Sequence, residues 1–397
     1  MIRKNRKKVS VPVLILSFLI VLSGCGSIRT EIESAADGLQ EILTADSAPT
    51  GETMPEVDSV SEGKYAYGTL DDETKQVYDE IVYAFSNRIT VTSSTTDTNV
   101  MEQAYQAVRY DYCDFFWIES LSYVKYSRED EITALEIAPT YSMTEEEQEA
   151  MQQQIDAEAE RMLADAPADG SDFDKALYVY ETLIREVDYV VGAENSQNII
   201  SAFVNHETVC QGYAYATQYL LEKLGVACTT VLGSANGETH AWNLVVMDGF
   251  YYYIDTTWGN SQFVYRSEDG EELSEEDILR FQYMDYDYFG VTTEMLLTTH
   301  APDAGINLPV CTATADNYYV HKGLYVDVWD ADAVGAIIRS GYENGDEVVR
   351  IRFSDMELCE QAVRYFLTDG HVFDYCYGLE SVQYLQEADS TVMVLVL

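Results

Sequence analysis

The most constraining feature of this sequence is a pair of apolar runs joined by Asp248-Gly249. The run before the pair, residues 239–246, alternates in the manner of a strand, and the run after it, residues 250–258, is predicted to be the return strand. An Asp-Gly pair between two such runs is a strong signal for a two-residue hairpin turn. The chain is therefore expected to build an antiparallel hairpin here.

This register decides which side chains meet. With a two-residue loop, Trp242 faces Asp255 across the hairpin and His240 faces Thr257. His240 and Asp255 then share one face at a diagonal backbone separation of about 7–8 Å, which two side chains can close. A one-residue change in the loop would put them on opposite faces. The spacing predicts an imidazole held by a carboxylate, although Asp255 can also cap a turn with Thr256 and Thr257.

A reactive residue stands at the start of a predicted helix. Cys210 precedes an apolar segment, residues 211–224, and Gly225 follows as a helix C-terminal residue. Unpaired N–H groups and the helix dipole favour a thiolate at such a position, although a single Cys there is usually a small core residue. Together with His240 and Asp255, Cys210 forms the nucleophile, base and orienting group of a cysteine acyl-transfer site. The backbone N–H of Cys210 is expected to bind the oxyanion.

The motifs VCQGYA, HAWN and YYIDTTWG, in that order, resemble those of the transglutaminase-like superfamily, and most closely its microbial exported lipoproteins. The resemblance covers roughly residues 172–262. It implies an α+β fold with a papain-like core, in which the Cys helix packs on an antiparallel sheet. It also implies that Cys210 is the nucleophile, His240 the base and Asp255 the third member. Members include amide cross-linkers, peptidases and peptide amidases, so the reaction stays open.

The surroundings of the triad are less defined by the sequence. Gln211, Trp242 and Trp258 are expected to bind substrate or to wall the site. Papain-like proteases carry an oxyanion-binding Gln shortly before the Cys, whereas Val204 stands six residues before Cys210 here. The second oxyanion donor is therefore unassigned.

The remaining His and Cys residues carry no motif. We expect His206 in a loop, His300 at the surface or in packing, and Asn243 in a structural role. The cysteines outside the site have no motif spacing, so no disulfide is predicted. No calcium loop or zinc spacing is present, and we predict neither a metal nor a cofactor.

The N-terminal residues have the pattern of an export signal. Five cations in residues 3–8 precede a short apolar run, Val9 to Leu22, and then Ser23-Gly24-Cys25. This resembles a bacterial lipobox, which implies cleavage after residue 24, lipidation of Cys25 and a position on the outer face of the cell membrane. An ordinary signal peptide and an uncleaved anchor are the alternatives.

The rest of the chain is divided by composition. We predict a signal peptide (1–24), a flexible tether (25–63), a helix-rich accessory domain (64–165), the catalytic core (166–262), an acidic, Tyr-rich extension (263–309) and a small α+β domain (310–397). The last is expected to run βαβαββ, with strands at 318–329 and 372–379. Residues 281–289 are expected either in the core or in stacking on glycan or peptide. Asp71, Asn99 and Asp172 are predicted helix caps.

The net charge of −46 excludes a nucleic-acid binder, which needs clustered Lys and Arg. An acidic surface favours cationic or neutral partners. The expected partner is a protein or peptide substrate, with the peptide part of the cell wall as one candidate, and the membrane is contacted through the lipid anchor only. A non-catalytic envelope adaptor with the same fold is the alternative function.

Overall fold

The computed structural model describes residues 13–15, 39–45, 49–55, 58–128, 131–260, 284–387 and 390–397. Its contacts divide the chain into two compact units. The larger unit comprises residues 23–261 and 287–314, and the smaller unit comprises residues 1–22, 262–286 and 315–397. The predicted triad lies entirely within the larger unit.

The centre of the larger unit is a five-stranded antiparallel sheet in the order β11-β10-β9-β8-β12. The strands are β8 (Cys228–Ala235), β9 (Glu238–Met247), β10 (Phe250–Ile254), β11 (Phe289–Val291) and β12 (His300–Pro302). The Asp248-Gly249 turn joins β9 to β10 in the predicted register, with Asn243 opposite Ile254.

The return strand is shorter than the prediction to residue 258. Strand β10 ends at Ile254, and helix α8 (Thr256–Gly259) follows. The cause is local, because the Asp255 side chain accepts a hydrogen bond from the Trp258 N–H and so caps a helical turn. The backbone N–H of Asp255 donates to the Tyr288 carbonyl instead of continuing the ladder to β9.

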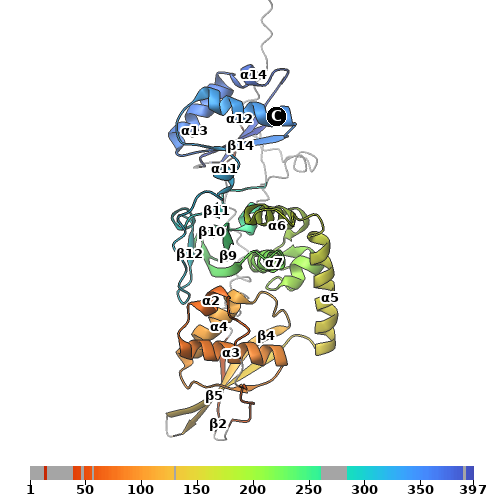
Figure 1. The fold of residues 1–397 in the computed structure, drawn as a ribbon, viewed down its shortest axis with the longest axis vertical. Coiled ribbons are helices and arrows are strands. Elements are labelled where there is room, and N and C mark those ends of the chain that lie inside the picture. The colour runs from red at the N-terminus through yellow and green to blue at the C-terminus, as the bar shows by residue number, and fades with distance from the viewer. Residues whose placement is uncertain are drawn as a thin grey trace, which may run out of the picture. The chain divides into compact units, whose positions relative to one another are not determined.

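Helix α7 (Cys210–Lys223) lies against this sheet, with α6 (Asp172–Glu186) beside it (Figure 1). Residues 210–221 are all buried, so α7 is a core helix along most of its length. The Asn243 side chain donates to the Ala214 carbonyl at 2.9 Å and ties α7 to β9. The predicted α+β fold, with a Cys helix on an antiparallel sheet, is confirmed.

Helix ends follow capping chemistry, with two corrections to the prediction. Asp71 caps α3 (Asp72–Asn87) as predicted. The cap of α4 (Thr98–Asp111) is Asp97 and not Asn99, because the Asp97 carboxylate accepts from the Asn99 N–H at 2.8 Å. The cap of α6 is Ser171 and not Asp172, because Ser171 and Asp174 form a reciprocal capping box.

The predicted accessory domain packs into the same unit as the core. The Tyr110 hydroxyl at the end of α4 donates to the Leu232 carbonyl in β8 at 3.1 Å. The Gln218 amide in α7 donates to the Asp111 carbonyl at 2.9 Å. Buried side chains of α3, α4, β8 and β9 share one apolar cluster. The N-terminal helices therefore brace the helix that carries Cys210.

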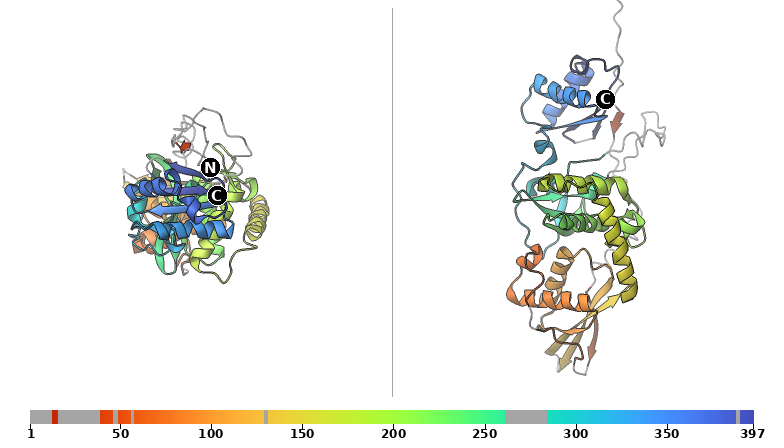
Figure 2. Two further views of the ribbon diagram at one scale, coloured as in Figure 1. Left: turned by 90° about the horizontal axis from the view of Figure 1, so that it is seen from above. Right: turned by 45° about the vertical axis from the view of Figure 1, so that its right-hand side comes forward.

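Helix α5 (Glu145–Met162), which begins at a Thr144 capping box, runs between the level of α7 and that of α3 on one side of the larger unit (Figure 2). Asp156 accepts hydrogen bonds from the Tyr219 hydroxyl at 2.8 Å and from the Lys223 ammonium at 2.7 Å. Further along, the Arg88 guanidinium donates to the Gln148 side chain at 2.6 Å. Polar contacts near the start of α5 and in its second half thus hold it in place.

A second sheet of the larger unit has four strands in the order β2-β4-β5-β3, and its strand β2 is part of the predicted tether. Its strands are β2 (Leu39–Ala45), β3 (Val91–Thr92), β4 (Ile118–Arg128) and β5 (Glu131–Tyr141). Strand β2 pairs parallel with β4, and the Glu52 backbone exchanges hydrogen bonds with Thr90 and Thr92. Ser61 is fully buried. These stretches are paired or packed, unlike a free tether.

The remaining elements of the larger unit are short. They are α2 (Tyr65–Gly68), β6 (Asp188–Tyr189), the π-helical turn η1 (Ser201–Asn205), β7 (Glu207–Thr208) and α10 (Thr293–Leu296). Within the described residues, no helix has the length and apolar character to cross a membrane.

The smaller unit has a five-stranded sheet in the order β1-β15-β16-β14-β13. Its elements are β1 (Val13–Ile15), α11 (Tyr318–His321), β13 (Tyr325–Val326), α12 (Ala331–Asn344), β14 (Val348–Phe353), α13 (Met356–Val363), η2 (Arg364–Thr368), α14 (Val372–Tyr375), β15 (Gln383–Glu387) and β16 (Val392–Val396).

The strand predicted at 318–329 is confirmed only as β13, because residues 318–321 form a helical turn. The strand predicted at 372–379 is wrong, because residues 372–375 form a helical turn. Short apolar runs do not distinguish a strand from a buried helical turn by periodicity. The predicted Cys25 lipidation site and all of the predicted signal peptide except Val13–Ile15 lie outside the described residues, as do residues 281–283 of the predicted Tyr-rich stretch.

The start of α7 depends on the absence of a side chain at Gly212. A Cβ at this position would collide with Thr208 Oγ1 and approach Ser201 Oγ within 2.8 Å. We expect Gly212→Ala to lower the free energy of unfolding by about 1–3 kcal/mol through overpacking. Urea denaturation of the purified protein measures this.

The matched control is Gly68→Ala, since a Cβ there meets no atom within 4 Å. Its free energy of unfolding should change by no more than about 0.5 kcal/mol. Equal destabilisation by the two substitutions would contradict the close approach at Gly212.

Candidate active site

The structure brings the three predicted triad residues together from α7, β9 and the end of β10. His240 Nε2 donates to Asp255 Oδ2 at 2.7 Å. Cys210 lies close enough to the imidazole to contribute to the raised pKa of His240. Since Nε2 is occupied by Asp255, Nδ1 is the nitrogen that faces the thiol. His240 and Asp255 meet although Asp255 is no longer part of β10, which ends at the preceding residue.

All three triad residues are buried, and Asp255 is the most buried of them. Cys210 is 5% exposed and His240 is 8% exposed, whereas Asp255 is 1% exposed. Cys210 and His240 thus keep a small exposed fraction, whereas Asp255 is almost fully enclosed. A buried carboxylate is costly unless it is paired and hydrogen-bonded, so this arrangement depends on the donors around Asp255.

Electrostatics favour a charged imidazole. Burial by itself would lower the pKa of His240, but the charge of Asp255 and hydrogen bonds to Asp255 and Cys210 raise the pKa to about 10. Burial likewise opposes ionisation of Asp255, but His240 and His300 hold the pKa of its carboxyl well below its usual range. An imidazolium beside the sulfur is the partner that a nucleophilic thiolate needs.

Helix α7 begins without a capping side chain. Val209 occupies the N-cap position, and its side chain accepts no hydrogen bond. Because the first N–H groups of a helix have no intrahelical partner, the N–H groups of Cys210 and Gln211 can donate to an oxyanion. The Gln211 N–H is therefore a candidate for the second oxyanion donor, which the sequence alone did not identify.

Aromatic rings enclose the imidazole. The Trp242 ring lies 6.0 Å from the His240 ring between centroids, and the Trp258 ring lies 5.9 Å from it. Tyr288 packs edge-on against Trp258 at 4.8 Å. Both Trp residues lie where walls of the site were predicted. Their apolar surroundings lower the local dielectric and strengthen the charge pair.

His300 belongs to the site, which corrects the prediction of a surface or packing residue. It is 2% exposed, and its Nε2 donates to Asp255 Oδ2 at 3.1 Å. Its Nδ1 lies 2.8 Å from Thr299 Oγ1, which in turn lies 2.7 Å from the Tyr288 hydroxyl. A hydrogen-bonded chain therefore runs from Tyr288 through Thr299 and His300 to the triad carboxylate.

The ligand atoms of His240, Asp255 and His300 lie within 4.8 Å of one another, a spacing that a metal ion can also use. In the arrangement described above both imidazoles donate to the same carboxylate oxygen. A metal ion would have to replace both N–H protons, so metal binding and the triad hydrogen bonds exclude each other.

The other predicted neighbours take distinct places. The Gln211 amide donates to the Gln197 carbonyl at 3.2 Å and so points toward the loop before α7. His206 follows η1 with a left-handed backbone and lies 3.6 Å from Glu158, in agreement with a loop position. Asn243 has the structural contact to α7 already described.

Six described cysteines are free and buried, so none of them forms a disulfide. They are Cys113, Cys210, Cys228, Cys311, Cys359 and Cys376. Burial raises the pKa of the Cys113 and Cys228 thiols well above the usual value, which makes them poor nucleophiles. Cys210, by contrast, lies beside the His240 imidazole and contributes to its raised pKa.

Comparison with known proteins agrees with this site. Residues 159–256 match the model of the transglutaminase-like superfamily, and this segment holds Cys210, His240 and Asp255. The resemblance predicted from the three motifs is confirmed. Trp258 and His300 lie outside the matched segment.

A curated relative is the kyphoscoliosis peptidase of Mus musculus, 29% identical over 108 residues. The match covers 23% of this chain and 16% of the relative, so it spans about a sixth of that protein's length.

Two solved structures are similar at low TM-scores. A crystal structure of a TGase is 16% identical with a TM-score of 0.26, over 47% of this chain and 55% of that one. A candidate cysteine protease from Cytophaga hutchinsonii is 15% identical with a TM-score of 0.24, over 35% of this chain and 65% of that one.

His300 is expected to act as a positioning residue for Asp255. We predict that His300→Phe shifts the pH profile of Cys210 alkylation by iodoacetamide by about one pH unit, because one hydrogen bond to a charged group contributes about 1.5–3 kcal/mol. Without this donor the Asp255 carboxylate is more basic and holds the His240 proton more tightly, which stabilises the thiolate and moves the profile to lower pH. Alkylation rates across pH, with peptide mapping of the modified Cys, measure the shift.

The control is His321→Phe, which removes the imidazole from a residue in the smaller unit. It should leave the pH profile unchanged. An unshifted profile in His300→Phe would show that His300 only fills space.

Proposed function

We propose that this protein is a thiol enzyme that acts on amide bonds of peptides or proteins through an acyl-enzyme at Cys210. The observation that carries the proposal is the convergence of Cys210, at the uncapped start of α7, with His240 and its hydrogen-bonded partner Asp255. The transglutaminase-like family model over the same residues supports it.

The geometry suggests each step. The Cys210 thiolate attacks the amide carbonyl carbon, and the oxyanion accepts hydrogen bonds from N–H groups at the start of α7. The His240 imidazolium gives its Nδ1 proton to the leaving amine, so a thioester and a free amine result. Neutral His240 then takes a proton from water or from a second amine as this attacks the thioester, which releases the product and restores the thiolate.

Asp255 serves both steps. It fixes the imidazole with Nε2 protonated, and it stabilises the positive charge that His240 carries before and after acylation. Its second oxygen holds the Trp258 N–H, so the carboxylate cannot rotate freely.

We further propose that the enzyme is lipid-anchored through Cys25 and acts at the outer face of the cell membrane, on envelope proteins or wall peptides. The basic start, the short apolar run and the Ser23-Gly24-Cys25 sequence support this. Metabolic labelling with a fatty-acid analogue, followed by comparison with Cys25→Ala, tests the anchor.

The test of the activity uses variants of two buried thiols. We expect Cys210→Ala to abolish both iodoacetamide labelling at neutral pH and conversion of envelope peptides. Cys228→Ala is the matched control, since Cys228 is also buried but has no imidazole partner, and it should keep both. Mass spectrometry then separates the reactions, because hydrolysis adds water, whereas transfer to an added alkylamine attaches that amine.

Equal conversion by wild type and Cys210→Ala would contradict the proposal. No conversion by either, with a cellular phenotype that Cys210→Ala leaves intact, would instead favour the envelope adaptor.

A further inference from the structure

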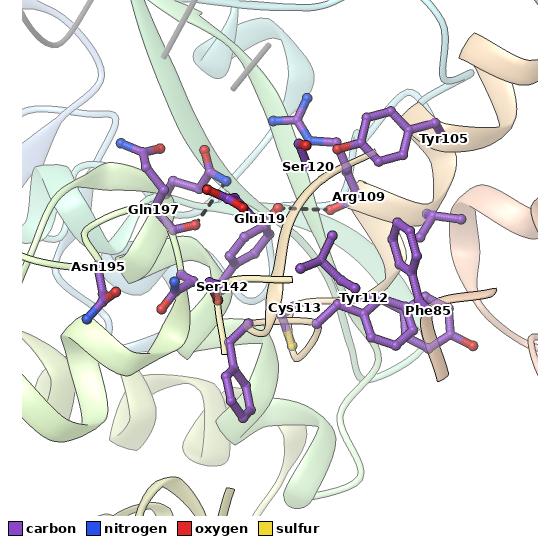
Figure 3. Close-up of a pocket in the computed structure, with 17 residues that line it drawn as sticks. Phe85, Tyr105, Arg109, Tyr112, Cys113, Glu119, Ser120, Ser142, Asn195 and Gln197 are labelled. Carbon is purple, nitrogen blue, oxygen red and sulfur yellow. Dashed lines mark hydrogen bonds between the residues drawn. The ribbon is translucent and has the colours of Figure 1, made fainter. Parts of the chain in front are cut away.

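A cavity of about 280 Å³ lies in the larger unit between α4, the start of β4, the loop at residues 195–198 and α7. Its walls include Tyr105, Arg109, Gln197, Gln211 and Tyr215. Figure 3 shows Asn195 and Gln197 on one side of this cavity, and Tyr105, Arg109 and Tyr112 on the other. The N-terminal helices thus supply one wall, and the segment that contains the nucleophile supplies the opposite one.

The cavity adjoins the nucleophile through α7. Gln211 directly follows Cys210, and its amide donates to the Gln197 carbonyl at 3.2 Å. Tyr215, one helical turn after Gln211, lines the same cavity, and its hydroxyl donates to the Arg109 carbonyl at 3.4 Å. Residues four apart share a helix face, so one face of α7 walls the cavity next to the face that carries the thiol.

Arg109 gives the cavity a definite charge. Its side chain is half-buried, with the guanidinium carbon 5.9 Å from the centre of the Tyr105 ring. In the described part of the chain, no carboxylate comes within ion-pair distance of it, and the exposed Asp303 acts on it only from further away. A half-buried cation without a close partner, in a chain of net charge −46, is suited to an anionic ligand group.

A second group on the wall also needs a partner. Gln197 Oε1 is buried and accepts no hydrogen bond within the described residues. A buried acceptor without a donor is costly, and a peptide N–H would satisfy it. The aromatic walls provide apolar contact for a carbon chain.

We propose that this cavity binds a residue in the acyl part of the amide substrate and prefers a side chain that ends in a carboxylate. Arg109 holds the carboxylate, Tyr105 and Tyr215 contact its carbon chain, and Gln197 Oε1 accepts a backbone N–H of the substrate. The inference rests on the proposed function, because the substrate must reach Cys210. Glu119 also lines the cavity, but it is exposed, so solvent and salt screen its charge more than that of Arg109.

The test compares two irreversible probes that differ only in charge, benzyloxycarbonyl-Glu and benzyloxycarbonyl-Gln acyloxymethyl ketones. Each labelling rate is divided by the iodoacetamide rate of the same variant, which corrects for changes in the thiol. We expect wild type to react about tenfold faster with the Glu probe, as a charge-assisted hydrogen bond of about 1.5 kcal/mol gives. Arg109→Gln should lose this preference, and Arg109→Lys should retain part of it.

Arg185→Gln is the matched control, because it removes the same charge from α6, outside the cavity. It should keep the wild-type preference for Glu. Equal rates for the two probes in wild type, or an unchanged preference in Arg109→Gln, would overturn the inference. If neither probe nor iodoacetamide labels Cys210, the proposed function itself fails.

Discussion

One buried carboxylate connects the parts of this site. Asp255 accepts hydrogen bonds from His240 in β9, from His300 in β12 and from the Trp258 N–H in α8. It stands where β10 ends, so the same residue stops a strand, starts a helical turn and orients the base. Removing such a group leaves two buried imidazoles without their acceptor, which is more costly than losing one surface ion pair.

The position of the thiol depends on a different constraint. Helix α7 is buried along most of its length, and it is held by β9 on one side and by α4 and α5 elsewhere. Rigid placement matters because a nucleophile misplaced by about 1 Å loses much of its effective concentration. The N-terminal helices are therefore part of the catalytic framework, and they also supply the Arg109 wall of the cavity.

The sequence was sufficient for the elements with strong local signals. Asp248-Gly249 gave the register of β9 and β10, and the apolar segment after Cys210 gave α7, so the triad could be predicted. The end of β10 could not be predicted, because residues 255–258 can either continue the strand or form a helical turn capped by Asp255. His300 was missed because it is 45 residues from Asp255 in the chain, and only the pairing of β12 with β8 brings it back. The single-turn helices of the smaller unit were missed because short apolar runs fit either structure.

Asp255 and Cys210 keep His240 protonated in a buried site. Imidazole nitrogen chemical shifts of labelled histidine, assigned with His240→Gln, report this directly across pH. The account predicts that His240 titrates near pH 10 in the wild type. In Asp255→Asn the imidazolium loses its charged partner while the site stays buried, so His240 should titrate at or below its ordinary value of about 6.5. Titration of His240 near or below that ordinary value in the wild type would contradict the account.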